Sequence, residues 1–329
     1  MRAIIPQEYE IYAIAACVFL RDFRVGVLLA RSTQNWTVAV RLTPFRDAYY
    51  AVRVAQEHVP FRVRKIKETP NVSLTRFDHP AGARLPDSEE QAADRFQINI
   101  VERGAFRLGH KGREWLLGTG CVFLSRPNEV YRYAHLKDIE PDSCLSVTLS
   151  RSFSREVSER LLCLALVPHI SNRLRFLQLE LASIVRDDIP LGLETLACEF
   201  FEAAAEASTG DRHLYRPNQL NWYAERIRAA RQRIDANPAD QHSLSQLSSL
   251  VAMSPFLFAR VFRELIGVPP HRYLIQLRLA RARTLLESGM SVTDTCYAAG
   301  FNNLSHFIRT FRRHFGLVPS AMKHLRWEQ

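Results

Sequence analysis

An internal repeat near the C-terminus constrains the fold of this 329-residue chain more than any other feature. The segments Phe258–Arg263 and Phe307–Arg312 share phenylalanine, arginine, phenylalanine and arginine at an offset of 49 residues. A glycine and a proline after each segment fall in the same register, Gly267 with Gly316 and Pro270 with Pro319. So many matches at one offset indicate a duplicated structural unit rather than chance.

Each copy carries the signals of two short helices joined by a tight turn. Ser243 and Ser291 stand where a capping box or a simpler serine cap would begin the shorter helices. In the first copy Ser254-Pro255 supplies an N-cap and a first-turn proline for the longer helix, and in the second Asn303 can cap it. The residues that follow Pro270 predict a helix linking the copies. The repeat therefore predicts two helix-turn-helix units.

The longer helix of each copy is amphipathic, with Phe258 and Phe262, then Phe307 and Phe311, on the face expected to be core. The residues on the opposite faces are candidates for DNA contact. Arginine can hydrogen-bond guanine or a phosphate, and small or apolar side chains can approach a thymine methyl group. The candidates are Phe256, Ala259, Arg260 and Arg263 in the first helix, and Leu304, Ser305, Ile308, Arg309 and Arg312 in the second.

Basic residues concentrate in the same part of the chain. Of the formal net charge of +10, residues 211–329 carry +9, with 17 Lys or Arg against 8 Asp or Glu. This asymmetry favours a polyanionic partner. An arginine-rich surface alone does not identify the anion, but together with duplicated helix-turn-helix units it predicts double-stranded DNA.

The middle of the chain has the pattern of an antiparallel β-structure. Short apolar runs such as Phe96–Val101 and Cys121–Leu124 are separated by glycine-containing turns, a spacing typical of a β-barrel or sandwich. Helical periodicity follows, and a second helix is expected across Leu191–Ala207. Leu174, Leu177, Leu181 and Ile184 lie on one helix face, which either forms a homodimer interface or covers the barrel.

Residues 1–70 show neither sustained helical nor sustained strand periodicity, and the sequence assigns them no role. Their longest apolar run, Ile11–Leu20, is too short to span a bilayer, and no export signal is recognisable. The six cysteines are scattered, which is typical of reduced thiols in the cytosol. We expect a cytoplasmic protein without a membrane partner.

These observations predict an α+β chain of two domains. Residues 71–210 would form a barrel or sandwich with helices at its C-terminal end, and residues 221–326 an all-α domain with two helix-turn-helix units.

The C-terminal part, about residues 224–326, resembles the DNA-binding domain of the AraC/XylS family of transcription regulators. The resemblance rests on Met253–Arg263 with Gly267, on Tyr273–Leu286, and most densely on Ala299–Phe307 with the residues through Ser320. It implies two recognition helices in successive major-groove segments of promoter DNA. Ala252 stands where the family usually has glycine, and a left-handed backbone at alanine would cost ~1 kcal/mol.

The middle of the chain is similar, more weakly, to the cupin-like sensory domain of many family members, through Val101–Phe106 and Asn128–Tyr131. That similarity implies a small-molecule effector or dimerisation, and the family's common mode implies activation with RNA polymerase as a partner. Metal-binding cupins cluster their histidines, whereas His110 and His135 stand alone, so we expect no metal or other cofactor.

Two other functions stay open on the sequence. One is a small-molecule enzyme built on the barrel, although no metal-ligand pair, nucleophile elbow or nucleotide-binding glycine motif is recognisable and no catalytic residue is assigned. The other is a nonspecific nucleic-acid-binding protein, which the basic C-terminal region would suit. A duplicated helix-turn-helix is more than such a role requires, so we expect a sequence-specific regulator.

Overall fold

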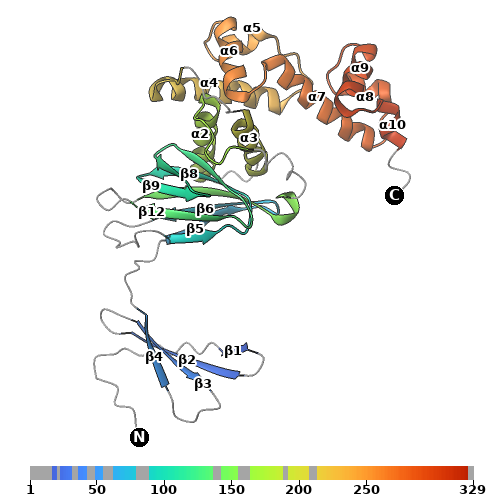
Figure 1. Cartoon of the computed structure of the whole chain (residues 1–329). Coiled ribbons are helices and arrows are strands. Elements are labelled where there is room, and N and C mark those ends of the chain that lie inside the picture. The colour runs from blue at the N-terminus through green and yellow to red at the C-terminus, as the bar shows by residue number, and fades with distance from the viewer. Residues whose placement is uncertain are drawn as a thin grey trace.

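The computed structural model of the chain describes residues 17–20, 23–31, 36–42, 49–54, 62–78, 89–135, 142–154, 164–187, 192–206 and 213–324. Strands come first along the chain and helices follow (Figure 1). The expected order, a β-rich region followed by a helical domain, is confirmed.

The N-terminal segment contains a four-stranded antiparallel sheet, paired in chain order. Its strands are β1 (Cys17–Leu20), β2 (Phe23–Arg31), β3 (Trp36–Leu42) and β4 (Tyr49–Val54). Sequence periodicity did not predict these strands. The run Phe23–Arg31 is mostly apolar without alternation, and periodicity cannot assign such a run to a strand or a helix.

Two further antiparallel sheets form the expected sandwich, with strand orders β10-β9-β12-β7 and β11-β8-β13-β6-β5. The strands are β5 (Arg62–Glu68), β6 (Val72–Asp78), β7 (Glu89–Ala92), β8 (Gln97–Arg103), β9 (Ala105–His110), β10 (Arg113–Gly118), β11 (Val122–Ser125), β12 (Val130–His135) and β13 (Ser143–Leu149). Because β5 pairs with β6, this sheet includes residues before the expected boundary at residue 71.

The five-stranded sheet is covered on both faces. Side chains alternate along β8: Ile98 and Ile100 belong to a core shared with the helices, and Val101 belongs to a second core between the two sheets. Phe123 of β11 joins that second core, whereas its neighbour Leu124 faces the helices. This arrangement explains why these strands are apolar at consecutive positions.

Two helices, α2 (Asn172–Asp187) and α3 (Leu193–Glu206), connect the sandwich to the helical domain. Leu174, Leu177 and Leu181 of α2 are at most 1% exposed, and Ile184 packs against the same core. The apolar stripe is thus covered within one chain, as one of the two sequence interpretations expected. It offers no free surface to a second copy.

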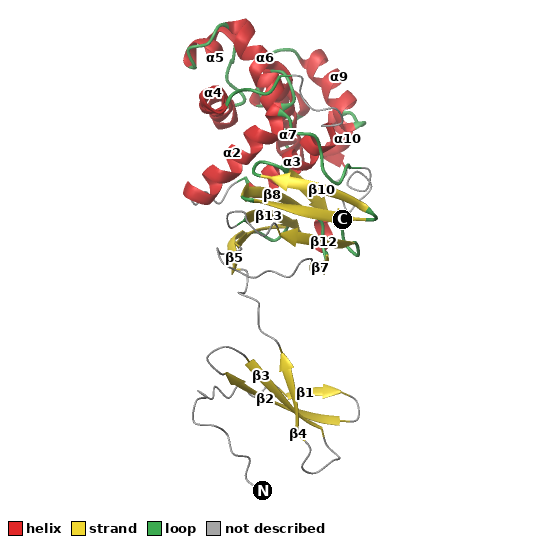
Figure 2. Cartoon of the chain, turned by 60° about the vertical axis from the view of Figure 1, so that its left-hand side comes forward, coloured by secondary structure: helices red, strands yellow, loops and turns green. Residues whose placement is uncertain are grey.

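The helical domain contains the two expected helix-turn-helix units, α5–α6 and α8–α9, joined by α7 (Figure 1). Its helices lie together at one end of the described chain, next to the strands of the sandwich (Figure 2). The helices are α4 (Pro217–Ala236), α5 (Leu244–Leu250), α6 (Pro255–Ile266), α7 (Pro270–Glu287), α8 (Val292–Ala298), α9 (Leu304–Phe315) and α10 (Pro319–His324). The first unit shares a hydrophobic core with α2, α3 and the five-stranded sheet, whereas the second has a separate core.

The separate core of the second unit makes its stability locally testable. Phe307 has no exposed surface and lies in that core, so Phe307→Ala should cost about 3–5 kcal/mol of local stability. Hydrogen exchange should accelerate at the amides of α8 and α9 and stay unchanged in α5 and α6. Equal acceleration in both units would show that they unfold as one.

Candidate nucleic-acid interface

The first unit is shaped by caps that the sequence predicts. Ser243 and Gln246 form a complete capping box at the start of α5. Ser254 accepts a hydrogen bond from the Leu257 backbone N–H at the start of α6. Between the two helices Ala252 has φ 52°, the left-handed conformation expected to be strained for alanine.

The second unit is built in the same way. The Ser291 side chain accepts a hydrogen bond from the Asp294 backbone N–H at the start of α8, and Asn303 accepts one from His306 at the start of α9. Gly300, with φ 91°, occupies the turn. The expected caps at Ser291 and Asn303 are therefore confirmed.

The inner faces of α6 and α9 are held by matching pairs of phenylalanines. Phe258 and Phe262 have no exposed surface and their ring centroids are 5.5 Å apart. Phe307 and Phe311 are equally buried, with ring centroids 5.6 Å apart. Arg260 and Arg309 precede Phe262 and Phe311 by two residues, so they point about 200° away from these rings.

The outer faces carry most of the candidate DNA contacts in exposed positions. Phe256 is 79% exposed, which is unusual for so large an apolar side chain. The exposed polar candidates are Arg260, Arg263, Ser305, Arg309 and Arg312, and Ala259 is half-buried.

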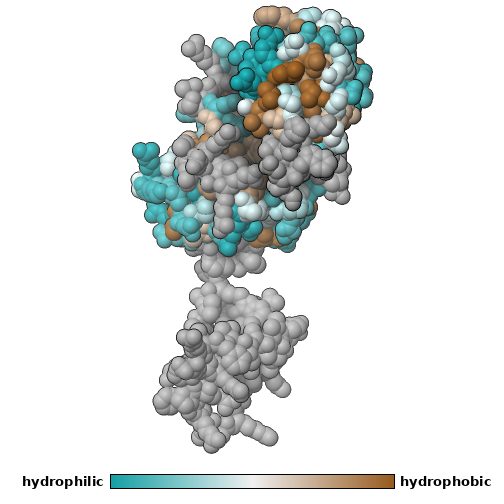
Figure 3. All heavy atoms as spheres, turned by 90° about the vertical axis from the view of Figure 1, so that its right-hand side faces the viewer, coloured by the Kyte–Doolittle hydropathy of each residue, from teal (hydrophilic) through white to brown (hydrophobic). Residues whose placement is uncertain are grey.

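Two candidates in the second helix are less accessible than the sequence suggested. Leu304 and Ile308 are half-buried and pack partly against the core of their own unit. Helical periodicity placed them on the outer face, but they lie at its edge, next to the phenylalanine core. Hydrophobic side chains gather on part of this end of the molecule, with hydrophilic ones around them (Figure 3).

Two arginines of α7 have partners within the protein. Arg278 of α7 donates to the backbone carbonyls of Pro238 and Asp240, and Arg283 pairs with Glu287, 2.7 Å away. These two arginines are engaged within the protein. Arg260 lies four residues before Glu264, but the Glu264 carboxylate accepts hydrogen bonds from other residues.

Glu264 connects α6 to the helices of the sandwich. Its carboxylate accepts hydrogen bonds from Asn172 Nδ2 and from the Tyr215 hydroxyl, each at 2.5 Å. The Tyr215 backbone N–H in turn donates to Asn172 Oδ1, at 2.9 Å. Burial and the bond to Glu264 raise the pKa of Tyr215 above its ordinary value, so this hydroxyl remains a donor.

A second contact is made by Arg173 of α2 at the C-terminal end of α6. Arg173 of α2 is 8% exposed, and its guanidinium donates to Glu206 at 2.5 Å and to Glu202 at 3.4 Å. The guanidinium also lies against Gly267, where a Cβ would come within 2.6 Å of Arg173 Cζ. Gly267 therefore ends the helix with a φ of 91° and also leaves room for Arg173.

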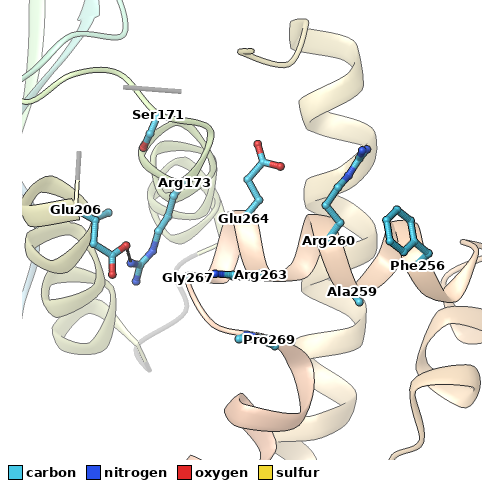
Figure 4. A pocket seen from close by; sticks show the side chains of 11 residues that line it. Ser171, Arg173, Glu206, Phe256, Ala259, Arg260, Arg263, Glu264, Gly267 and Pro269 are labelled. Atoms are coloured by element: carbon cyan, nitrogen blue, oxygen red, sulfur yellow. Dashed lines mark hydrogen bonds and ion pairs between the residues drawn. The ribbon is translucent and has the colours of Figure 1, made fainter. Parts of the chain in front are cut away.

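A cavity of about 670 Å³ lies between these two contacts and the outer face of α6. Figure 4 shows Arg173 and Glu206 meeting on one side of it, with Glu264, Arg260 and Phe256 along α6. The candidate DNA-contact residues of the first unit thus border α2 and α3. No local pattern predicts this contact, because Asn172 and Glu264 are 92 residues apart.

A smaller cavity of about 80 Å³ lies between the two sheets of the sandwich. Its lining combines aromatic rings with amide and other polar groups: Phe77, Gln91, Gln97, Asn99, Phe106, Phe123, Tyr133, Asp142, Cys144 and Ser146. Burial raises the pKa of Tyr133 to about 12, which keeps its hydroxyl protonated.

Of the two histidines singled out in the sequence, the structure describes the side chain of His110 alone. His110 stacks on Tyr131 at 4.7 Å and lies 3.4 Å from the Glu129 carboxylate, while the side chain of His135 lies outside the described residues. No group of three or more His, Cys, Asp or Glu in the described part of the chain could hold a metal ion.

No described helix is long and apolar enough to cross a membrane.

Two family models match the chain. A helix-turn-helix domain model matches residues 247–324, and an AraC-like ligand binding domain model matches residues 80–140.

Similar proteins are named as transcription regulators. The transcriptional activator RhaS of Escherichia coli O81 (strain ED1a) is 26% identical over 258 residues, 73% of this chain and 90% of RhaS. The regulator GbdR of Pseudomonas aeruginosa (strain UCBPP-PA14) is 33% identical over 87 residues, 26% of this chain and 24% of GbdR. The crystal structure of ToxT from Vibrio cholerae O395, 14% identical, covers 78% of this chain and 99% of ToxT with a TM-score of 0.30.

The turn of the first unit yields a prediction about strain. Ala252→Gly should stabilise the first unit by about 0.5–1 kcal/mol, because glycine adopts a positive φ without a Cβ penalty. Thermal unfolding of the full chain would measure the change. The reciprocal Gly300→Ala should destabilise the second unit, since its Cβ would lie 2.7 Å from the Ala239 backbone. An unchanged or lowered melting temperature for Ala252→Gly would contradict the assignment of strain.

Proposed function

This chain belongs to the AraC/XylS family of transcription regulators and is a DNA-binding transcription factor, and we propose that it activates a bacterial promoter in response to a small effector. Recognition of the promoter is supported by one observation above all. Two outward-facing arginines, Arg260 and Arg309, lie at matching positions opposite the buried phenylalanines of α6 and α9. In helix-turn-helix proteins the second helix of each unit enters the major groove.

The length of α7 suits two docked units on one face of DNA. With 18 residues, α7 is about 27 Å long, comparable to the helical repeat of about 34 Å that separates successive major-groove segments. Arg260 and Arg309 would hydrogen-bond base edges, and Arg263 and Arg312, one turn further on, would bind bases or phosphates.

The sandwich supplies the proposed effector site. The family model for ligand binding covers residues 80–140, and the cavity between the sheets draws lining residues such as Gln91, Phe106 and Tyr133 from that range. Aromatic faces beside amide groups suit a small molecule with both apolar surface and hydrogen-bonding groups. At about 80 Å³ the cavity is small, so an effector of more than a few atoms would have to widen it.

The contact between α2 and α6 offers a route from the effector site to DNA. Helix α2 packs against the five-stranded sheet through the shared core and holds α6 through Asn172, Tyr215 and Glu264. The acidic Glu206 beside the outer face of α6 disfavours approach of DNA phosphates. We infer that this contact restrains DNA binding until the effector loosens it. As an activator the protein would also contact RNA polymerase, and a homodimer would have to use a surface other than the buried stripe of α2.

The arginine assignment is testable by replacing Arg309. An operator selected by the full-length protein from random duplexes, and a scrambled version of it, would be titrated with wild type and with Arg309→Ala. If Arg309 reads a base, affinity for the operator should fall by about 1–3 kcal/mol while binding to scrambled DNA changes little. Arg260→Ala should behave alike, and Arg233→Ala, an exposed arginine of α4, serves as the charge-matched control. Unchanged affinity for both duplexes would exclude the proposed docking of α9.

The restraint on α6 is testable through Tyr215. Tyr215→Phe deletes one hydrogen bond to Glu264, worth about 1 kcal/mol, and should raise effector-free affinity for the selected operator by up to about fivefold. Tyr297→Phe removes a hydroxyl from an exposed tyrosine of α8 and should leave that affinity unchanged. Weaker binding by Tyr215→Phe would show instead that the contact holds α6 ready for DNA.

A further inference from the structure

A second open groove runs between α7 and α9, outside the residues assigned to base recognition. Its volume is about 530 Å³. The polar side chains that line it are His271, Arg272 and Gln276 of α7, with His306, Thr310, Arg313 and His314 of α9.

The charged side chains that line this groove are all basic. None of the described residues that line it is acidic. Arg272 and Arg313 are exposed, and within the described part of the chain neither forms an ion pair. Arg278 and Arg283 on the same α7 are, by contrast, engaged by carbonyls and by Glu287. The groove therefore presents two unpaired guanidinium groups, and neutral imidazoles still offer N–H donors.

The groove adjoins the proposed base-reading face of α9. At 100° per residue, Arg313 lies 40° and His306 lies 60° from Arg309 around the helix, both on the same side. A helix of about 10–12 Å diameter fills a major groove about 12 Å wide, so a phosphate strand passes along each flank. On the other flank Leu304 and Ile308 pack partly into the core, so the flank with Arg313 is the open and basic one.

The internal repeat shows that this basic flank is particular to the second unit. The positions in α6 that match His306 and Arg313 are Leu257 and Glu264. Leu257 packs against the core that the first unit shares with α2, α3 and the five-stranded sheet. Glu264 accepts hydrogen bonds from Asn172 and Tyr215. The same flank is thus covered by the sensory-domain side in the first unit, and open and positively charged in the second.

We propose that the groove between α7 and α9 binds the phosphate backbone of the DNA strand that borders the second major-groove segment. This site rests on the proposed function, because it needs α9 docked in DNA. It supplies affinity that is independent of base sequence. The second unit, which the sandwich helices do not contact through Glu264, would thereby bind the phosphate backbone of the DNA.

The test measures the salt dependence of binding with the full-length protein. The dissociation constant of the selected operator duplex, and of its scrambled version, is determined between 50 and 200 mM salt for wild type, Arg272→Ala and Arg313→Ala. Loss of one phosphate contact should reduce the slope of log K against log salt by about 0.9. The affinity lost by each variant should accordingly shrink about threefold to fourfold across that range, equally for both duplexes.

Two variants control for charge and folding. Arg281 lies nine residues after Arg272 on α7, 180° around the helix, so Arg281→Ala removes the same charge from the opposite side and should leave the slope unchanged. Arg313→Lys keeps the charge and should retain the wild-type slope. Thermal unfolding of each variant shows that a change in slope does not come from loss of structure.

A modified duplex locates the contact. Methylphosphonate groups, which lack the phosphate charge, are placed one at a time along the strand bordering the second segment. At one position the wild type should lose several-fold in affinity while Arg313→Ala loses nothing further.

Unchanged slopes for both groove variants, with operator binding intact in the wild type, would overturn the site and leave the proposed function standing. Normal DNA binding with reduced transcription by purified RNA polymerase would also overturn it, because the groove would then take an acidic protein surface. No preference of the wild type for the operator over scrambled DNA would mean that the proposed function itself fails.

Discussion

The burial of two phenylalanines in each recognition helix is the constraint on which the rest of the binding surface depends. Phe258 and Phe262 in α6, like Phe307 and Phe311 in α9, have no exposed surface. Each pair spans one helical turn and fixes the rotation of its helix against the domain core. Once that rotation is fixed, Arg260 and Arg309 can only point outward. The proposed recognition chemistry is therefore a consequence of core packing.

The two units are equivalent in sequence and unequal in their surroundings. The core of the first unit continues through α4, α2 and α3 to the five-stranded sheet, whereas the core of the second unit is separate. A displacement of α2 relative to the sheet would be transmitted to α6 because closely packed side chains leave no room to absorb it. The second unit is linked to that core through α7. The proposed regulation would thus act on the first unit, and the proposed backbone contact would belong to the second.

The division is visible in side chains that occupy matching places in the repeat. Glu264 accepts hydrogen bonds from Asn172 of α2 and from Tyr215, while the matching Arg313 lines an open basic groove. Gly267 leaves room for Arg173, while a Cβ at the matching Gly316 would meet nothing within 4 Å. In both pairs the position in the helix-turn-helix unit is shared, and the neighbouring side chains decide what each residue contacts.

The sequence by itself determined the elements that depend on local interactions. Serine and asparagine caps and the spacing of the phenylalanines each act within a few residues, so both helix-turn-helix units could be predicted with their outward arginines. Short apolar runs separated by glycine turns predicted the sandwich for the same reason. The tertiary structure decided what depends on residues far apart in the chain. It covered the α2 stripe within the chain, engaged Arg278 with carbonyls near Asp240, drew Leu304 and Ile308 toward the core and joined Asn172 to Glu264. Periodicity shows which side of a helix is apolar, but only packing in three dimensions decides which neighbour each side meets.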